Sequence, residues 1–120
     1  MFPFSKRPAA NAIATFGLIS LAVASPARAM AGDVAAGREK AQQCQTCHGL
    51  DGLAKIAEAP NLAGQNEQYL IKQLTAFKTG ERQNEMMSIV APALSDTDIE
   101  NLAAYYSAIE ISIGKVPGDQ

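Results

Sequence analysis

The chain has 120 residues, of which 48% are hydrophobic and 18% are charged, with a formal net charge of -2. That length accommodates one domain, and the balance of residue types excludes a disordered acidic tail and a basic nucleic-acid-binding protein. Two cysteines and a single histidine exclude a disulfide-dense scaffold, a four-cysteine zinc site and a multi-histidine metal site.

The N-terminal segment has the pattern of a secretory signal peptide. Lys6 and Arg7 precede an uncharged run over residues 9–24, and Ala27-Arg28-Ala29 supplies small residues where a signal peptidase reads them. A membrane anchor is the alternative interpretation. The apolar run is about 16 residues long, which is shorter than the roughly 20 residues that a spanning helix needs.

We therefore expect residues 1–29 to be removed on export to the periplasm and residues 30–120 to form the working domain. Cleavage after Ala31 is the alternative, because Ala29-Met30-Ala31 fits the same rule. From Met30 onward the sequence has seven basic and twelve acidic residues, so the mature charge is 7 − 12 = -5. A domain this small usually needs a disulfide, a metal or a cofactor to complete its core.

The first predicted helix runs from Val34 to about Gln43. Asp33 precedes it and offers a carboxylate to the free N–H groups of the first turn. Gly37 inside this helix costs up to about 1 kcal/mol relative to alanine. Its presence reflects either simple tolerance or the close approach of a second helix.

The run Cys44-Gln45-Thr46-Cys47-His48 is the strongest signal in the chain. Cysteines three residues apart present two thiols on the same side of one turn, and each thiol is able to add to one vinyl group of a haem. The adjacent histidine then directs its imidazole at the iron. This spacing is the haem c attachment signature, so it predicts thioethers at Cys44 and Cys47 and a proximal iron ligand at His48.

Three other interpretations of this motif stay open with less support. A thioredoxin-like redox pair belongs beside a βαβ pattern, which the flanking sequence lacks. A structural disulfide would close a very short loop, and a zinc site would lack a fourth ligand within reach.

Residues 49–64 carry scattered Gly, Asp, Pro and Asn, which predicts an irregular loop with one short turn near residues 55–59. A second helix is predicted from about Glu67 to Lys78. Its apolar stripe consists of Tyr69, Leu70, Leu74 and Phe77. Gly80 follows at the position where a helix end favours a left-handed residue.

A second axial ligand has to come from a residue other than histidine. Met86 and Met87 are the candidates, and they follow a polar stretch over residues 80–85 that suits a loop. Core packing is the alternative role for such a pair. A haem without a second protein ligand would instead indicate gas binding or peroxidase chemistry.

The third helix is predicted to start after Ser95, where Ser95 and Asp98 form a capping-box pattern. Its apolar positions are Ile99, Leu102, Ala103, Tyr106 and Ile109. Residues 109–113 alternate briefly and are interpreted as the helix end. The predicted fold class is all-α, with three main helices and long loops.

With these elements in place, the sequence resembles the class I cytochromes c, most closely one haem domain of the bacterial cytochrome c4 and c553 group. The resemblance covers nearly all of the mature chain and depends on the order of its pieces. These pieces are Ala36-Gly37, residues 44–49, residues 60–65, residues 69–74, and Leu94-Ser95-Asp96 leading into residues 102–106.

The resemblance implies a class I cytochrome c fold around one covalent haem c, and it gives three residues a role. The Pro60 carbonyl would accept the second ring N–H of His48, which orients the imidazole. Gly37 would mark the crossing of the first and last helices, against Leu102 and Tyr105. The distal iron ligand would be Met87, seven residues before Leu94, with Met86 as the alternative.

The expected function is that of a periplasmic monohaem electron carrier with His/Met ligation and no catalytic residues. Its partners would be transient redox proteins, with no nucleic acid and no stable membrane insertion. The haem subunit of an exported dehydrogenase complex is the alternative. Cytochrome c4 itself has two haem domains, whereas this chain has one haem motif.

Overall fold

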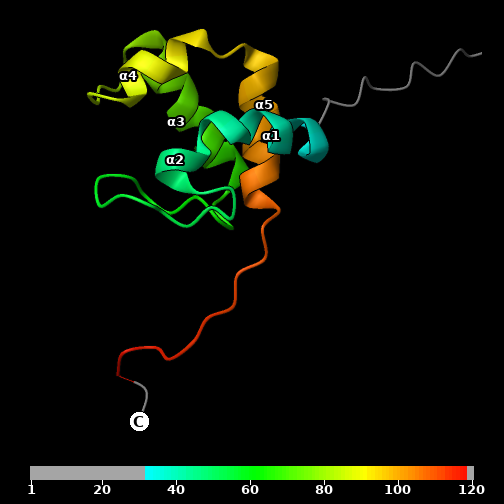
Figure 1. The fold of residues 1–120 in the computed structure, drawn as a ribbon, viewed down its shortest axis with the longest axis vertical. Coiled ribbons are helices and arrows are strands. Elements are labelled where there is room, and N and C mark those ends of the chain that lie inside the picture. Colours follow the sequence, from blue (N-terminus) through cyan, green and yellow to red (C-terminus); the bar gives the residue numbers. More distant parts are fainter. Residues whose placement is uncertain (1–31, 119–120) are drawn as a thin grey trace, which may run out of the picture.

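The computed structural model describes residues 32–118, so the predicted signal peptide over residues 1–29 lies outside the described part (Figure 1). Within residues 32–118 the protein is helical and has no strand. This confirms the predicted all-α class. The helical elements, in chain order, are α1 (Val34–Lys40), η1 (Ala41–Gln43), α2 (Gln45–His48), α3 (Glu67–Thr79), α4 (Met87–Val90), η2 (Ala91–Ala93) and α5 (Asp96–Ser107).

The first predicted helix is present and tightens toward its end. Asp33 caps α1, since its Oδ1 accepts a hydrogen bond from the Ala36 N–H at 2.9 Å. The α-helix ends at Lys40, and the 3-10 turn η1 continues it to Gln43. Together α1 and η1 span the predicted range.

Helix α3 extends one residue beyond the predicted end. Asn66 begins it, with its side chain accepting from the Tyr69 N–H at 2.9 Å. Gly80 ends it at φ +79, the left-handed conformation that glycine adopts without strain. The sequence therefore specifies both ends of this helix locally.

Both bonds of the predicted capping box are present at the start of α5. The Ser95 Oγ accepts from the Asp98 N–H at 3.0 Å, and the Asp98 carboxylate accepts from the Ser95 N–H at 2.9 Å. The helix ends at Ser107, so the interpretation of residues 109–113 as a helix end is wrong. These residues are extended and lead away from the helices (Figure 1), although Ile109 still packs on the core.

Short helices between the main ones were not predicted. A four-residue helix such as α2 or α4 has no periodic pattern to read, and it depends on local caps and neighbours. Helix α4 begins where the Asn84 Oδ1 accepts from the N–H groups of Met86 and Met87, at 3.0 and 3.1 Å. Pro92 follows at the start of η2.

The core forms where α1 and α3 both pack against α5. Gly37 is buried at the crossing of α1 and α5, and a Cβ built on it would lie 2.8 Å from the Tyr105 Cβ and clash with the Asn101 carbonyl. This confirms the predicted role of Gly37 as the crossing point. The buried cluster consists of Ala41, Leu70, Leu94, Ile99, Leu102, Ala103, Tyr105 and Tyr106.

Of the helices described in residues 32–118, none has the length and the apolar content needed to cross a membrane.

Candidate haem site

The haem motif forms one compact turn. Cys44 precedes α2, and its carbonyl accepts from the N–H groups of Cys47 and His48 at 3.3 and 3.0 Å. Gly49 then ends the helix at a φ of +73. The five residues from Cys44 to His48 span little more than one helical turn, so the two cysteines and the histidine lie close together along the chain.

Both cysteines are partly buried, and their sulfurs are not joined to each other. Burial is the largest influence on Cys44 and raises the pKa of its thiol, while the neighbouring Lys40 acts in the opposite direction. In the described part of the chain, no cluster of three or more His, Cys, Asp or Glu side chains is placed to hold a metal ion.

The His48 ring is oriented by a backbone carbonyl. Its Nδ1 lies 2.9 Å from the carbonyl oxygen of Pro60. Since a carbonyl only accepts, Nδ1 carries a proton and donates, so that in the neutral ring the lone pair lies on Nε2. A neutral imidazole with a free Nε2 is the form that ligates iron.

Pro60 reaches His48 because the loop over residues 49–64 folds back on itself. The Lys55 N–H donates to the Cys47 carbonyl at 2.8 Å, and the Leu62 N–H donates to the Gly52 carbonyl at 2.8 Å. Residues 55–59 form the predicted short turn. The loop is irregular, as expected, yet these bonds fix its path.

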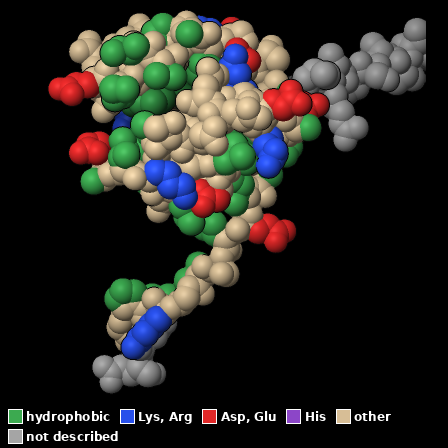
Figure 2. Space-filling view, in the orientation of Figure 1, with side chains coloured by type: hydrophobic (Ala, Val, Ile, Leu, Met, Phe, Trp, Pro, Cys, Tyr) green, Lys and Arg blue, Asp and Glu red, His purple; other side chains and the backbone are tan. Residues whose placement is uncertain are grey.

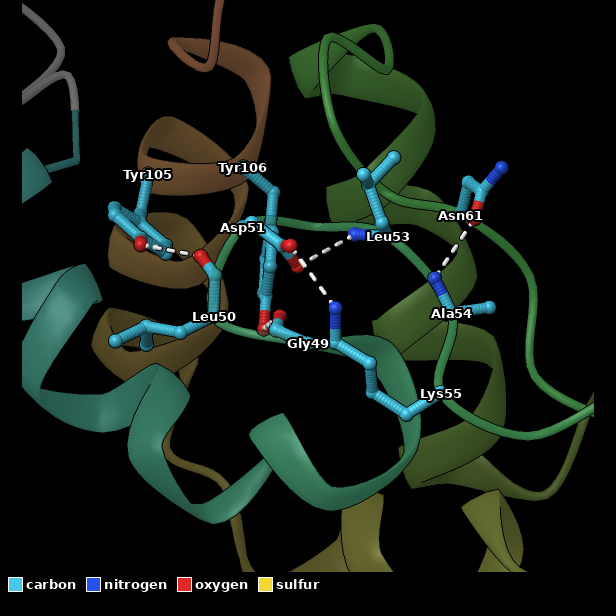
Figure 3. Close-up of polar contacts among 9 residues, drawn as sticks. All are labelled: Gly49, Leu50, Asp51, Leu53, Ala54, Lys55, Asn61, Tyr105 and Tyr106. Carbon is cyan, nitrogen blue, oxygen red and sulfur yellow. Dashed lines mark hydrogen bonds and ion pairs between the residues drawn. The ribbon is translucent and has the colours of Figure 1, made fainter.

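Two polar side chains inside this loop stabilise it further (Figure 3). The Asp51 carboxylate accepts from the Lys55 ammonium at 2.9 Å and from the Leu53 N–H at 3.1 Å. The hydrogen bond from Lys55 is the main reason that the pKa of Asp51 is lowered. The Asn61 side chain accepts from the Ala54 N–H at 2.8 Å, next to Pro60.

The two methionines differ in burial. Met87 is the first residue of α4 and is partly buried, whereas Met86 precedes the helix and is 57% exposed. Helix α4 lies on the same side of the crossed pair α1 and α5 as α2 does (Figure 1).

Sequence reasoning missed the polar role of two tyrosines. Tyr105 and Tyr106 were identified as core and family residues, but their hydroxyls donate to the carbonyls of Leu50 and Gly49, at 2.6 and 3.2 Å. A buried tyrosine hydroxyl needs a hydrogen-bond partner, so the sequence could have predicted that each of these hydroxyls forms a hydrogen bond. The rule does not say which carbonyl the hydroxyl would find.

The donor set and its surroundings fit a covalently attached haem. Two thiols, one imidazole with a free Nε2 and one thioether are the ligands and attachment points that haem c takes. The loop that carries Pro60 exposes Leu53 and Ile56, and the segment around Met87 exposes Met86 and Ile89. Figure 2 shows apolar side chains gathered on the face that carries α4, as a flat apolar group would require.

Comparisons with known proteins agree with this geometry. The family model described as Cytochrome c matches residues 34–108, from the start of α1 to just past the end of α5. Cytochrome c4 of Pseudomonas aeruginosa is 43% identical over 100 residues, which is 83% of this chain and 47% of that protein.

Two further proteins are similar to this chain. The thiosulfate dehydrogenase electron acceptor of Thiomonas intermedia is 41% identical over 102 residues, which is 84% of this chain and 44% of that protein. The crystal structure of reduced recombinant cytochrome c4 from Pseudomonas stutzeri aligns with a TM-score of 0.64 at 41% identity, covering 70% of this chain and 49% of that one. This chain thus spans about half the length of these relatives.

Proposed function

The chain belongs to the cytochrome c family, and we propose that it is a periplasmic monohaem electron carrier with His/Met axial ligation. Membership of this family brings covalent haem c as the cofactor. When bound, haem c supplies an iron that alternates between the ferrous and ferric states, one electron at a time. The chain itself attaches, orients and encloses this group.

Each residue of the haem motif has one task in this proposal. Cys44 and Cys47 supply the two thioether attachments, and His48 is the proximal ligand through Nε2. The Pro60 carbonyl holds the imidazole orientation and increases its basicity. The proposal is carried by one observation, the 2.9 Å contact between His48 Nδ1 and that carbonyl, because it leaves the ligating nitrogen free.

Met87 completes the set as the distal ligand. Its partial burial at the start of α4 favours it over the exposed Met86. A neutral thioether opposite an imidazole raises the haem potential, which suits an electron carrier.

Substitution of the two methionines tests this assignment with matched variants. We expect the thioether-to-iron absorption band of the oxidised protein to vanish in Met87→Ala and to persist in Met86→Ala. The reverse pattern would move the ligand to Met86. A high-spin ferric spectrum with rapid carbon monoxide binding in the unmodified protein would instead indicate a ligand-binding or peroxidase-like protein.

Export to the periplasm is the second part of the proposal. Residues 1–29 act as the signal peptide, and residues 30–120 form the mature haem domain, with Ala31 as the alternative cleavage point. Attachment of haem c outside the cytoplasm agrees with export. The intact mass of the holoprotein purified from periplasm tests this, since a retained Met1 would contradict it.

The partners are transient redox proteins that give and receive single electrons. With seven basic and twelve acidic residues after Met30, the mature chain is suited to a basic partner. Raising the ionic strength should then slow electron transfer with that partner, because salt screens the attraction between them. The similarity to a thiosulfate dehydrogenase electron acceptor supports one alternative, the haem subunit of an exported dehydrogenase. Co-purification with a larger flavin or quinone protein would favour that alternative.

A further inference from the structure

Tyr106 touches both ends of the loop that carries Pro60. Its hydroxyl donates to the carbonyl of Gly49, the residue directly after His48, at 3.2 Å. Its own backbone carbonyl accepts from the Gly64 N–H at 2.9 Å. One residue of α5 therefore holds the beginning and the end of a sixteen-residue segment, residues 49–64.

Tyr105 adds a second bond at the beginning of this loop. Its hydroxyl donates to the Leu50 carbonyl at 2.6 Å, and its ring centroid lies 5.1 Å from that of Tyr106. Figure 3 shows the two rings extending from α5 to the adjacent carbonyls of the loop. Both side chains are buried, with 9% and 3% exposed, so water competes little for these hydroxyls.

Helix α5, which carries both tyrosines, is itself held in place by its N-terminal cap and by α1. Its first turn is fixed by the capping box, and α1 crosses it tightly at Gly37. Burial also raises the pKa of Tyr106, so its hydroxyl keeps the proton that it donates. The two tyrosines thereby transmit the position of α5 to the loop.

The position of the Pro60 carbonyl depends on the two ends of the loop. Gly49 follows His48 directly, and Gly64 lies four residues after Pro60. Within the loop, the Gly52 carbonyl accepts from the N–H groups of Leu62 and Ala63 at 2.8 and 3.1 Å, so the two arms are joined. A shift of either end would therefore change the distance between His48 Nδ1 and the Pro60 oxygen.

We infer that Tyr106, assisted by Tyr105, is a positioning residue that sets the hydrogen bond between the proximal histidine and Pro60. The inference rests on the proposed function, because it assigns His48 to the iron. Neither tyrosine touches the ligating nitrogen. Each acts through the backbone of the loop, and the consequence is control of ligand basicity and thus of the reduction potential.

The test uses the holoprotein with Tyr106→Phe, Tyr105→Phe and, as the matched control, Tyr69→Phe on the exposed side of α3. Each variant keeps the ring and removes one hydroxyl. We expect the amide hydrogens of Lys55 and Leu62 to exchange about three- to tenfold faster in Tyr106→Phe, because one hydrogen bond to a buried carbonyl is lost. Tyr105→Phe should also show an increase, because its hydroxyl donates to the next carbonyl of the loop at 2.6 Å, and Tyr69→Phe should show none.

The second measurement is the midpoint potential of the same proteins. A weaker bond from His48 to Pro60 lowers the basicity of the imidazole and stabilises the ferric state less, so the potential of Tyr106→Phe should rise. Amide exchange within α3 should stay unchanged, which separates loop release from general destabilisation.

Three outcomes overturn the inference, and they separate it from the proposed function. Equal loop exchange in Tyr106→Phe and Tyr69→Phe, or a Tyr106→Phe potential that stays unchanged or falls, overturns the positioning role and leaves the proposed function standing. Absence of a low-spin His/Met spectrum in the unmodified protein overturns the proposed function and the inference with it.

Discussion

The crossing of α1 and α5 and the loop of residues 49–64 are held together by different kinds of contact. At the crossing, α1 lies so close to the Asn101 carbonyl and the Tyr105 Cβ of α5 that Gly37 has no space for a Cβ. In the loop, the contacts are hydrogen bonds to backbone carbonyls and to the side chains of Asp51 and Asn61, while the large apolar side chain of Leu53 is left half-exposed. The first region gains stability from burial, and the second gains a defined position from directional bonds.

The strongest test of this contrast is to remove the cofactor attachment. In Cys44→Ala/Cys47→Ala we expect the mature chain to lose its cooperative thermal transition, a loss of at least about 5 kcal/mol of folding free energy. The physical reason is the small core, in which Ile99 is the largest side chain that is fully buried in the described residues. Circular dichroism on heating measures this. A cooperative transition would show that the helix crossing folds by itself.

Gly37→Ala tests the crossing alone. We expect it to lower the free energy of unfolding by about 2–3 kcal/mol, because the new methyl group meets the Asn101 carbonyl and the Tyr105 Cβ. Gly114→Ala is the matched control, since a Cβ there meets open space. Urea unfolding of the holoproteins compares them, and equal stabilities would mean that the helices separate without cost.

Ser95→Ala tests the N-terminal cap of α5, the helix that carries the two tyrosines bonded to the loop. Removing the hydroxyl that caps α5 should cost about 1 kcal/mol. Ser112→Ala in the exposed C-terminal segment should cost almost nothing. The same urea experiment checks both variants, and a larger loss in Ser112→Ala would contradict the importance of the cap.

The smallest expected effect is a dependence of stability on pH at Asp98. The hydrogen bond from the Ser95 N–H, with help from Lys40, holds the pKa of this carboxyl below its usual value. Stabilisation is therefore present above the unfolded pKa of about 4 and is lost as pH falls through the lower folded value. Asp98→Asn should be less stable than the unmodified protein at pH 7, and the gap should shrink in acid. A gap that is constant with pH would contradict this assignment.

Local sequence signals predicted the main helices well. Asp33, Gly80 and the pair Ser95 and Asp98 act on the backbone within a few residues, so their effect is visible without a tertiary structure. Helix α4 escaped prediction because four residues give no period. The alternation over residues 109–113 suggested a helix end, although the helix had already ended at Ser107.

The candidate site was predictable where its residues are neighbours in sequence and where the family resemblance supplied a distant one. The motif from Cys44 to His48 is recognised directly in the sequence, and the family resemblance supplied the roles of Pro60 and Met87. The hydroxyl bonds from α5 join residues 55 and 57 positions apart, to Leu50 and Gly49. Such pairings depend on how the helices pack, so neither composition nor residue spacing predicts them.

The acceptors around His48 have a consequence for mutational tolerance. Pro60, Gly49 and Leu50 each contribute a carbonyl oxygen, which every amino acid possesses. The donors are the side chains of His48, Tyr105 and Tyr106, which substitution readily removes. A complete substitution scan should therefore find that loss of these hydrogen bonds is concentrated on the donors, whereas intolerance at Leu50 should follow only from the packing of its side chain on the core. Substitutions would then reveal the donors of this network but not its backbone acceptors, although both are essential to the geometry.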